Sequence, residues 1–151
     1  MDLRYRVFAH VSRPVHEVFE AVADPNKLSH YFTTGGAVGR LETGATVTWD
    51  FHDFPGAFPV HVIEVVPDER IVLEWKANDP GAGDAYNVTV TMGFKPLDGG
   101  RTLVEIAEEG WHDTATGLKA SYGNCMGWAQ MVAALKVWVE HGINMREGMY
   151  K

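Results

Sequence analysis

The chain has 151 residues, 46% hydrophobic and 22% charged, which is the composition of a globular domain that builds its core without staples. Its single cysteine, Cys125, excludes an intrachain disulfide, a structural zinc site built on cysteines and a protein-held iron–sulfur cluster. Lys and Arg number 13 against 20 Asp and Glu, a formal net charge of −7 without any basic run, which argues against nucleic acid and anionic membranes as partners.

The N-terminal residues lack the apolar stretch of a signal peptide. The chain also has no run of about 18 apolar residues, the length that a transmembrane helix needs. We therefore expect a cytoplasmic protein with no membrane span.

The first third of the chain predicts one strand and two short helices. Residues 3–11 alternate between apolar and polar side chains, the period of a half-buried strand. Ser12 and Pro14 are typical of a helix start, and the Asp-Pro pair at 24–25 ends that helix. A second short helix is expected over about 25–31.

The middle of the chain predicts strands only. Alternation with period two recurs in five segments: 46–51, 60–66, 71–76, 86–95 and 102–109. Pro55, Gly56 and Pro59 predict a turn before the second of these strands. Asp98-Gly99-Gly100 predicts a hairpin before the last.

The last third changes period. From about Thr114 to His141, apolar residues recur at spacings of three and four, which predicts one long amphipathic helix with Gly142 as its C-cap. The tail, 143–151, is too apolar for a free end, so we expect it to pack on the domain or on a second copy of the chain. The predicted organisation is a single domain over 1–142 followed by this tail.

The order of elements predicts an α+β fold. We expect a curved antiparallel sheet of six to seven strands around a long C-terminal helix, with two short helices after the first strand. The space between sheet and helix is either filled by side chains or left as a cavity.

Three segments resemble known sequence patterns. Residues 12–32 resemble APxExVWxALTDPxxLxxWF, residues 64–75 resemble EVxPPxRLxxTW, and Gly127-Trp128 with Leu135-Lys136 resembles GWxxxLxxLK. These are patterns of the START-related, Bet v-type helix-grip superfamily (SRPBCC), in the branch named for the C-terminal domain of the heat-shock protein 90 ATPase activator homologues. The resemblance covers nearly the whole chain and implies a helix-grip fold with a cavity. Relatives include hydrophobic-ligand carriers, polyketide cyclases and chaperone co-factors, so it implies no single chemistry.

Metal and thiol chemistry find little support. The seven histidines form no pair at the spacing of metal ligands, so we expect no metal site, and no motif indicates a cofactor. Cys125 lies on the apolar stripe of the last helix, and no Lys or His lies one turn away. We expect it to line the core or a pocket rather than to act as a nucleophile.

Glu108 is the candidate for acid–base chemistry. By strand parity it shares a face with Val104 and Ile106, which should face the long helix. A desolvated carboxylate there would suit a general acid or base, with Tyr122 as its hydroxyl partner. The alternative, which we favour, is that the strand ends near Ala107 and leaves Glu108 at a solvated rim.

The aromatic content, five Trp, five Tyr and seven Phe, exceeds what a small core needs. We interpret the excess as the wall of a pocket for an apolar molecule, with a bulky core as the alternative. The candidate ligand-binding residues are Trp49, Phe51, Trp75, Tyr86, Val88, Tyr122, Cys125, Met126 and Trp128. Asn124 is a further candidate for orienting a ligand.

Two glycines, Gly123 and Gly127, lie inside the predicted last helix, where each weakens the helix by about 1 kcal/mol relative to alanine. Close packing against another element would explain them, and we favour this explanation over a helix break at 122–124.

Three functions follow from these observations. The leading hypothesis is the binding of a small, largely apolar molecule in a cavity between the sheet and the last helix, by a domain that is non-enzymatic or of unknown activity. A cyclase or hydratase acting on an aromatic or polyketide-like substrate is the second. A co-chaperone-like interaction domain is the third, and the apolar tail makes homodimerisation a further prediction.

Overall fold

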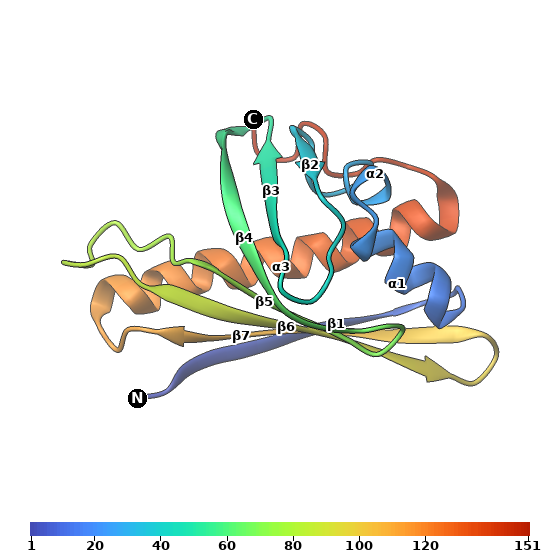
Figure 1. The fold of residues 1–151 in the computed structure, drawn as a ribbon, viewed down its shortest axis with the longest axis horizontal. Helices are drawn as coiled ribbons and strands as arrows, with labels where there is room; N and C mark the ends of the chain where they lie inside the picture. Colours follow the sequence, from blue (N-terminus) through green and yellow to red (C-terminus); the bar gives the residue numbers. More distant parts are fainter.

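In the computed structural model, which describes all 151 residues, a seven-stranded antiparallel sheet curves around one long helix (Figure 1). The strands lie in the order β1-β7-β6-β5-β4-β3-β2. Their bounds are β1 Leu3–Val11, β2 Gly36–Val38, β3 Thr46–Phe51, β4 Phe54–Val66, β5 Arg70–Lys76, β6 Asn87–Leu97 and β7 Arg101–Trp111. The helices are α1 Val15–Ala23, α2 Pro25–Leu28 and α3 Ala115–His141. This is the predicted helix-grip fold.

The sheet buries one face because its strands alternate. In β7, the side chains of Thr102, Val104, Ile106 and Glu108 are buried, whereas the residues between them are only partly so. The β6–β7 hairpin forms as predicted, with Leu97 opposite Arg101. Gly99 and Gly100 make its turn at φ of 75° and 70°, a conformation that suits glycine.

The two short helices begin differently from the prediction. The N-cap of α1 is Pro14, with no side-chain hydrogen bond, whereas the backbone N–H of Ser12 donates to Glu140 of α3. Ser12 therefore ties β1 to α3 instead of capping α1. At the start of α2, the side chain of Asp24 accepts the N–H of Asn26, and the helix covers only 25–28 of the predicted 25–31.

Helix α3 matches its predicted length. The hydroxyl of Thr114 accepts the N–H of Gly117 at the start, and Gly142 ends the helix at φ 70°. The helix packs along β1 and β7 on the concave face, and α1 covers β6 and β7 beside it. None of the helices has both the length and the apolar character needed to cross a membrane.

Strand β4 is longer than predicted, and the expected turn over Pro55, Gly56 and Pro59 is wrong. The β3–β4 hairpin turns at 52–53, with Phe51 opposite Phe54. Prolines are tolerated where a strand pairs irregularly, and the register shifts between Trp49 and Phe51, as a bulge does. Pro55, Gly56 and Pro59 therefore lie within β4 and do not end it.

Candidate ligand-binding site

Glu108 is buried in the interior. Strand β7 runs on to Trp111, and the side chain of Glu108 has an exposed fraction of 0%. The favoured expectation of a solvated rim is therefore wrong. The strand passes beyond Ala107 because Gly110, at φ 103°, takes up a backbone conformation that most residues avoid and lets Trp111 pack inward.

Four neutral side chains donate hydrogen bonds to the Glu108 carboxylate. The Tyr5 hydroxyl donates to Oε1, and the indole N–H groups of Trp75 and Trp128 donate to Oε2 over 3.0 Å and 3.2 Å. The Asn124 amide lies 3.1 Å from Oε1 and 3.3 Å from Oε2. We call these five residues the Glu108 cage; they come from β1, β5, β7 and α3.

The cage holds its carboxylate without a cation. Glu108 forms no ion pair with any lysine, arginine or histidine. Burying an ionised carboxylate costs several kcal/mol, which only well-placed donors offset. Burial, and then the charge of Glu108, raise the pKa of Tyr5 well above its usual range, so Tyr5 stays protonated and donates.

Cys125 lies beside the cage and is half-buried. Burial, followed by the charge of Glu108, raises the pKa of its thiol. A thiol kept protonated is a weak nucleophile, which agrees with the expectation that Cys125 is a wall residue.

Tyr122 is not the hydroxyl partner of Glu108. Its side chain is 66% exposed, because residues two apart on a helix point to nearly opposite sides, and Asn124 takes the inward position. The tyrosine that bonds Glu108 is Tyr5, which lies directly opposite it in the β1–β7 pairing. The acid–base pair of Glu108 with Tyr122 is therefore not formed.

A layer of aromatic rings fills the space between α3 and the strands β3–β5. We call it the aromatic layer; it consists of Phe32, Trp49, Phe51, Phe58, Trp75 and Trp128. Trp75 lies at its centre, with its ring centroid 5.8 Å from Trp49, 5.7 Å from Phe58 and 5.3 Å from Trp128. Since α3 packs directly on β1 and β7, these large rings bridge the wider space to β3–β5.

The expected open cavity is therefore occupied by side chains. Two hollows of the molecule lie away from this space. One, of about 270 Å³, is formed by residues 76–86, and the other, of about 130 Å³, lies beside the tail and includes Thr34 and His52. A ligand between the sheet and α3 has to displace rings of the aromatic layer.

The layer reaches the surface beside two glycines of α3. A Cβ atom built on Gly123 or Gly127 meets nothing within 4 Å, and the helix is unbroken, so neither close packing nor a helix break explains these residues. Gln130, one turn beyond Gly127, accepts a hydrogen bond from Tyr150, whose ring lies 5.9 Å from that of Phe54 at the start of β4. The glycine side of α3 thus faces β4.

One member of the cage, Asn124, lies close to this side of α3. Asn124 lies one turn before Gly127 on the same side of α3 and is partly exposed. Across from it, Phe51, Phe58 and Trp75 are also partly exposed. We call the partly exposed surface that includes Asn124, Gly127 and these rings the glycine opening, because a Cβ on Gly127 would meet nothing within 4 Å.

The remaining candidates separate into two groups. Trp49, Phe51, Trp75 and Trp128 belong to the aromatic layer. Tyr86 and Val88 lie in a smaller apolar cluster with Trp111, where the Tyr86 hydroxyl donates to Asp79 over 2.7 Å. Met126 is 53% exposed and, like Tyr122, points away from the cage.

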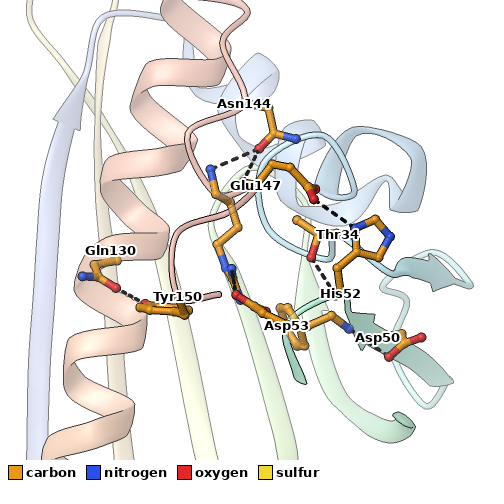
Figure 2. Close-up of polar contacts among 10 residues, drawn as sticks. Thr34, Asp50, His52, Asp53, Gln130, Asn144, Glu147 and Tyr150 are labelled. Atoms are coloured by element: carbon orange, nitrogen blue, oxygen red, sulfur yellow. Dashed lines mark hydrogen bonds and ion pairs between the residues drawn. The ribbon is translucent and has the colours of Figure 1, made fainter. Parts of the chain in front are cut away.

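The tail folds back against the tip of the β3–β4 hairpin (Figure 2). The guanidinium of Arg146 donates to both carboxylate oxygens of Asp53, over 2.6 Å and 2.9 Å, and both side chains are buried. It lies 5.4 Å from the ring centre of Phe51 and 4.6 Å from that of Tyr150. Arg146 holds the pKa of Asp53 below its usual value. Sequence reasoning missed this ion pair, since no motif links the tail to the hairpin.

Comparison with known proteins now identifies the family. Residues 12–140 match the family model described as "Activator of Hsp90 ATPase homolog 1-like protein". The chain belongs to this family. It lies within the START-related, Bet v-type superfamily, as the sequence patterns implied. A search of the curated proteins finds no match.

Several solved structures share the fold. A Staphylococcus saprophyticus protein, SSP2350, is 26% identical, with a TM-score of 0.75 over 94% of this chain and 96% of that one. MLL2253 from Mesorhizobium loti is 17% identical, with a TM-score of 0.79 over 91% of this chain and 97% of that one. The Aha1 dimer from Colwellia psychrerythraea is 17% identical, with a TM-score of 0.75 over 93% of this chain and 98% of that one.

Proposed function

We propose that this family member binds a small, largely apolar molecule in the aromatic layer, and that the molecule enters through the glycine opening. The observation that carries the proposal is the partly exposed row of Phe51, Phe58 and Trp75 beside a side of α3 where a Cβ on Gly123 or Gly127 would meet open space. Ligand pockets are lined by rigid aromatic walls with a few polar groups, and the Glu108 cage supplies those groups at the inner end.

Catalysis is less well supported. A cyclase or hydratase needs a second proton-transferring group beside Glu108, and Tyr122 points to solvent. Burial, and then the charge of Glu108, raise the pKa of Tyr5, the hydroxyl that does reach Glu108, and this favours its neutral form. Both observations favour a binding protein over an enzyme.

Protein interaction has one supporting observation. Tyr122 and Met126, one turn apart on α3, are both more than half exposed. The Aha1 protein from Colwellia psychrerythraea, which shares this fold, was solved as a dimer. A second copy of the chain is therefore the first partner to test, by light scattering of the wild type and of Met126→Glu; a monomeric mass for both would dismiss it.

The binding proposal is tested with the neutral fluorophore N-phenyl-1-naphthylamine. We expect saturable binding, with quenching of tryptophan emission because Trp75 and Trp128 lie in the layer. Gly127→Leu fills the glycine opening and should weaken binding by about tenfold or more, which corresponds to about 1.4 kcal/mol. Its folding should be intact, since a side chain at this position meets open space.

Ala133→Leu is the matched control. It adds the same side chain to α3 at an exposed position on the side away from the glycine opening, and should leave fluorophore binding unchanged. Binding that is absent in the wild type, or equally tight in both variants, would overturn the proposal. Native mass spectrometry of the purified protein adds an independent search for a bound molecule.

A further inference from the structure

We infer that the ligand carries a protonated amine on its apolar body, and that this cation binds the Glu108 carboxylate in the place of the Asn124 amide, beside Trp75 and Trp128. The inference rests on the proposed function and names the chemical class of the ligand.

No cation of the chain compensates the charge of the Glu108 carboxylate. Glu108 is completely buried, yet its four partners are all neutral donors. A buried carboxylate is far more stable beside a cation, and the tail of this same protein provides one for Asp53. The cage is thus a binding site for positive charge that the chain itself leaves unfilled.

Aromatic rings surround the Glu108 carboxylate. Trp75 and Trp128, with ring centroids 5.3 Å apart, both border the carboxylate through their indole N–H groups. A cation within about 6 Å of a tryptophan ring is attracted to its face, and aromatic cages recognise ammonium groups in this way. The net charge of −7 also favours the approach of a cation.

One donor of the cage, the Asn124 amide, can be displaced from the Glu108 carboxylate. The Asn124 amide is shared between both carboxylate oxygens, at 3.1 Å and 3.3 Å. The second of these is the longest hydrogen bond in the cage, slightly longer than the 3.2 Å of Trp128. It is also partly exposed at the glycine opening. An ammonium group that displaces this amide replaces its hydrogen bonds with charge-assisted ones, while Tyr5, Trp75 and Trp128 keep theirs.

The test compares 1-naphthylmethylamine with 1-naphthalenemethanol, which share the ring and differ in the ammonium and hydroxyl groups. By calorimetric titration at neutral pH, we expect the wild type to bind the amine at least about tenfold more tightly than the alcohol. The preference should survive high salt, which screens surface charge but not a buried pair.

Two variants locate the preference. Glu108→Gln removes the charge and should bring the two affinities to within about twofold, with the alcohol bound as before. Asn124→Ala removes the competing amide and should tighten the amine several-fold more than the alcohol. The second variant tests the same contact if the first fails to fold.

The possible outcomes separate the two proposals. If the wild type binds both compounds equally, or if salt abolishes the preference, the inference about the amine is overturned and the binding function stands. If neither compound binds and N-phenyl-1-naphthylamine does not bind either, the proposed function itself fails. A preference that Glu108→Gln leaves intact would also overturn the inference.

Discussion

Two buried carboxylates in this protein have opposite surroundings. Asp53, at the tip of the β3–β4 hairpin, is paired with Arg146 by two hydrogen bonds, and the guanidinium lies against Phe51 and Tyr150. Glu108, on β7, is held by neutral donors alone. Phe51 and Trp75 connect the two places, since both belong to the aromatic layer.

The difference lies in how the charge of each carboxylate is compensated. The charge of Asp53 is neutralised within the chain, so its effect is structural: it fastens the tail to the hairpin. The charge of Glu108 is not neutralised, so burying it weakens the fold unless a ligand compensates. This contrast is the basis on which we propose a binding site at Glu108 and a structural contact at Asp53.

Breaking the Asp53 pair should have the largest effect on stability. Arg146→Met leaves Asp53 as an uncompensated buried charge and should lower the free energy of unfolding by about 3 kcal/mol, measured by urea denaturation. Arg70→Met, which removes an exposed guanidinium paired with Glu64, is the control and should cause no measurable change. Equal effects of the two substitutions would contradict the structural role of Arg146.

Acid should remove the same ion pair in the wild type. Arg146 lowers the pKa of Asp53 below the unfolded value of 3.8, so its contribution is complete above that pH and disappears as pH falls through the lowered pKa. The stability difference between the wild type and Asp53→Asn should therefore stay constant near neutral pH and close only below 3.8. A difference that closes while the pH is still near neutral would show that another group is responsible.

At the Glu108 cage, removing one donor should have a moderate effect. Tyr5→Phe deletes the hydroxyl that bonds the carboxylate and should lower the free energy of unfolding by about 1.5 kcal/mol, the value of a hydrogen bond to a charged group. Tyr122→Phe is the matched control, because its hydroxyl is on the exposed side of α3. If Tyr122→Phe proves the more destabilising, the assignment of the cage is wrong.

The glycine opening should give the smallest effect, and of opposite sign. Gly127→Ala should raise the free energy of unfolding by about 0.5–1 kcal/mol, because alanine favours the helix and its Cβ meets open space. Gly117→Ala should destabilise instead, because its Cβ would lie 2.1 Å from the carbonyl oxygen of His112. Destabilisation by both substitutions would mean that the opening is closed.

Local patterns predicted most of the fold. The alternation in β5–β7 and the helical spacing in α3 arise because each element buries one face. This pattern can be recognised in each segment without knowing the rest of the fold. The same parity placed Glu108 on the inner face, but the position where β7 ends depends on Gly110 and on the packing of Trp111. The prolines of β4 act as turn signals in isolation and are accommodated by a bulge in the sheet.

The site was predicted less completely, because its contacts join residues far apart in sequence. Tyr5 and Glu108 are 103 residues apart in the sequence and meet only because β1 pairs with β7 in this register. Tyr5 shares one face of the alternating segment 3–11 with Leu3 and Val7, but the alternation alone does not predict which strand pairs with this segment. For the Arg146–Asp53 pair, no motif links the tail to the hairpin.

The most direct test of the account follows the indole N–H resonances of the five tryptophans by nuclear magnetic resonance while 1-naphthylmethylamine is added. Trp→Phe variants assign the signals. The account predicts large, saturable shifts for Trp75 and Trp128, whose N–H groups bond Glu108, and little change for Trp111 and Trp138, which lie outside the aromatic layer. Shifts confined to Trp111 or Trp138, or no shift in any of the five, would contradict a binding site at the Glu108 cage.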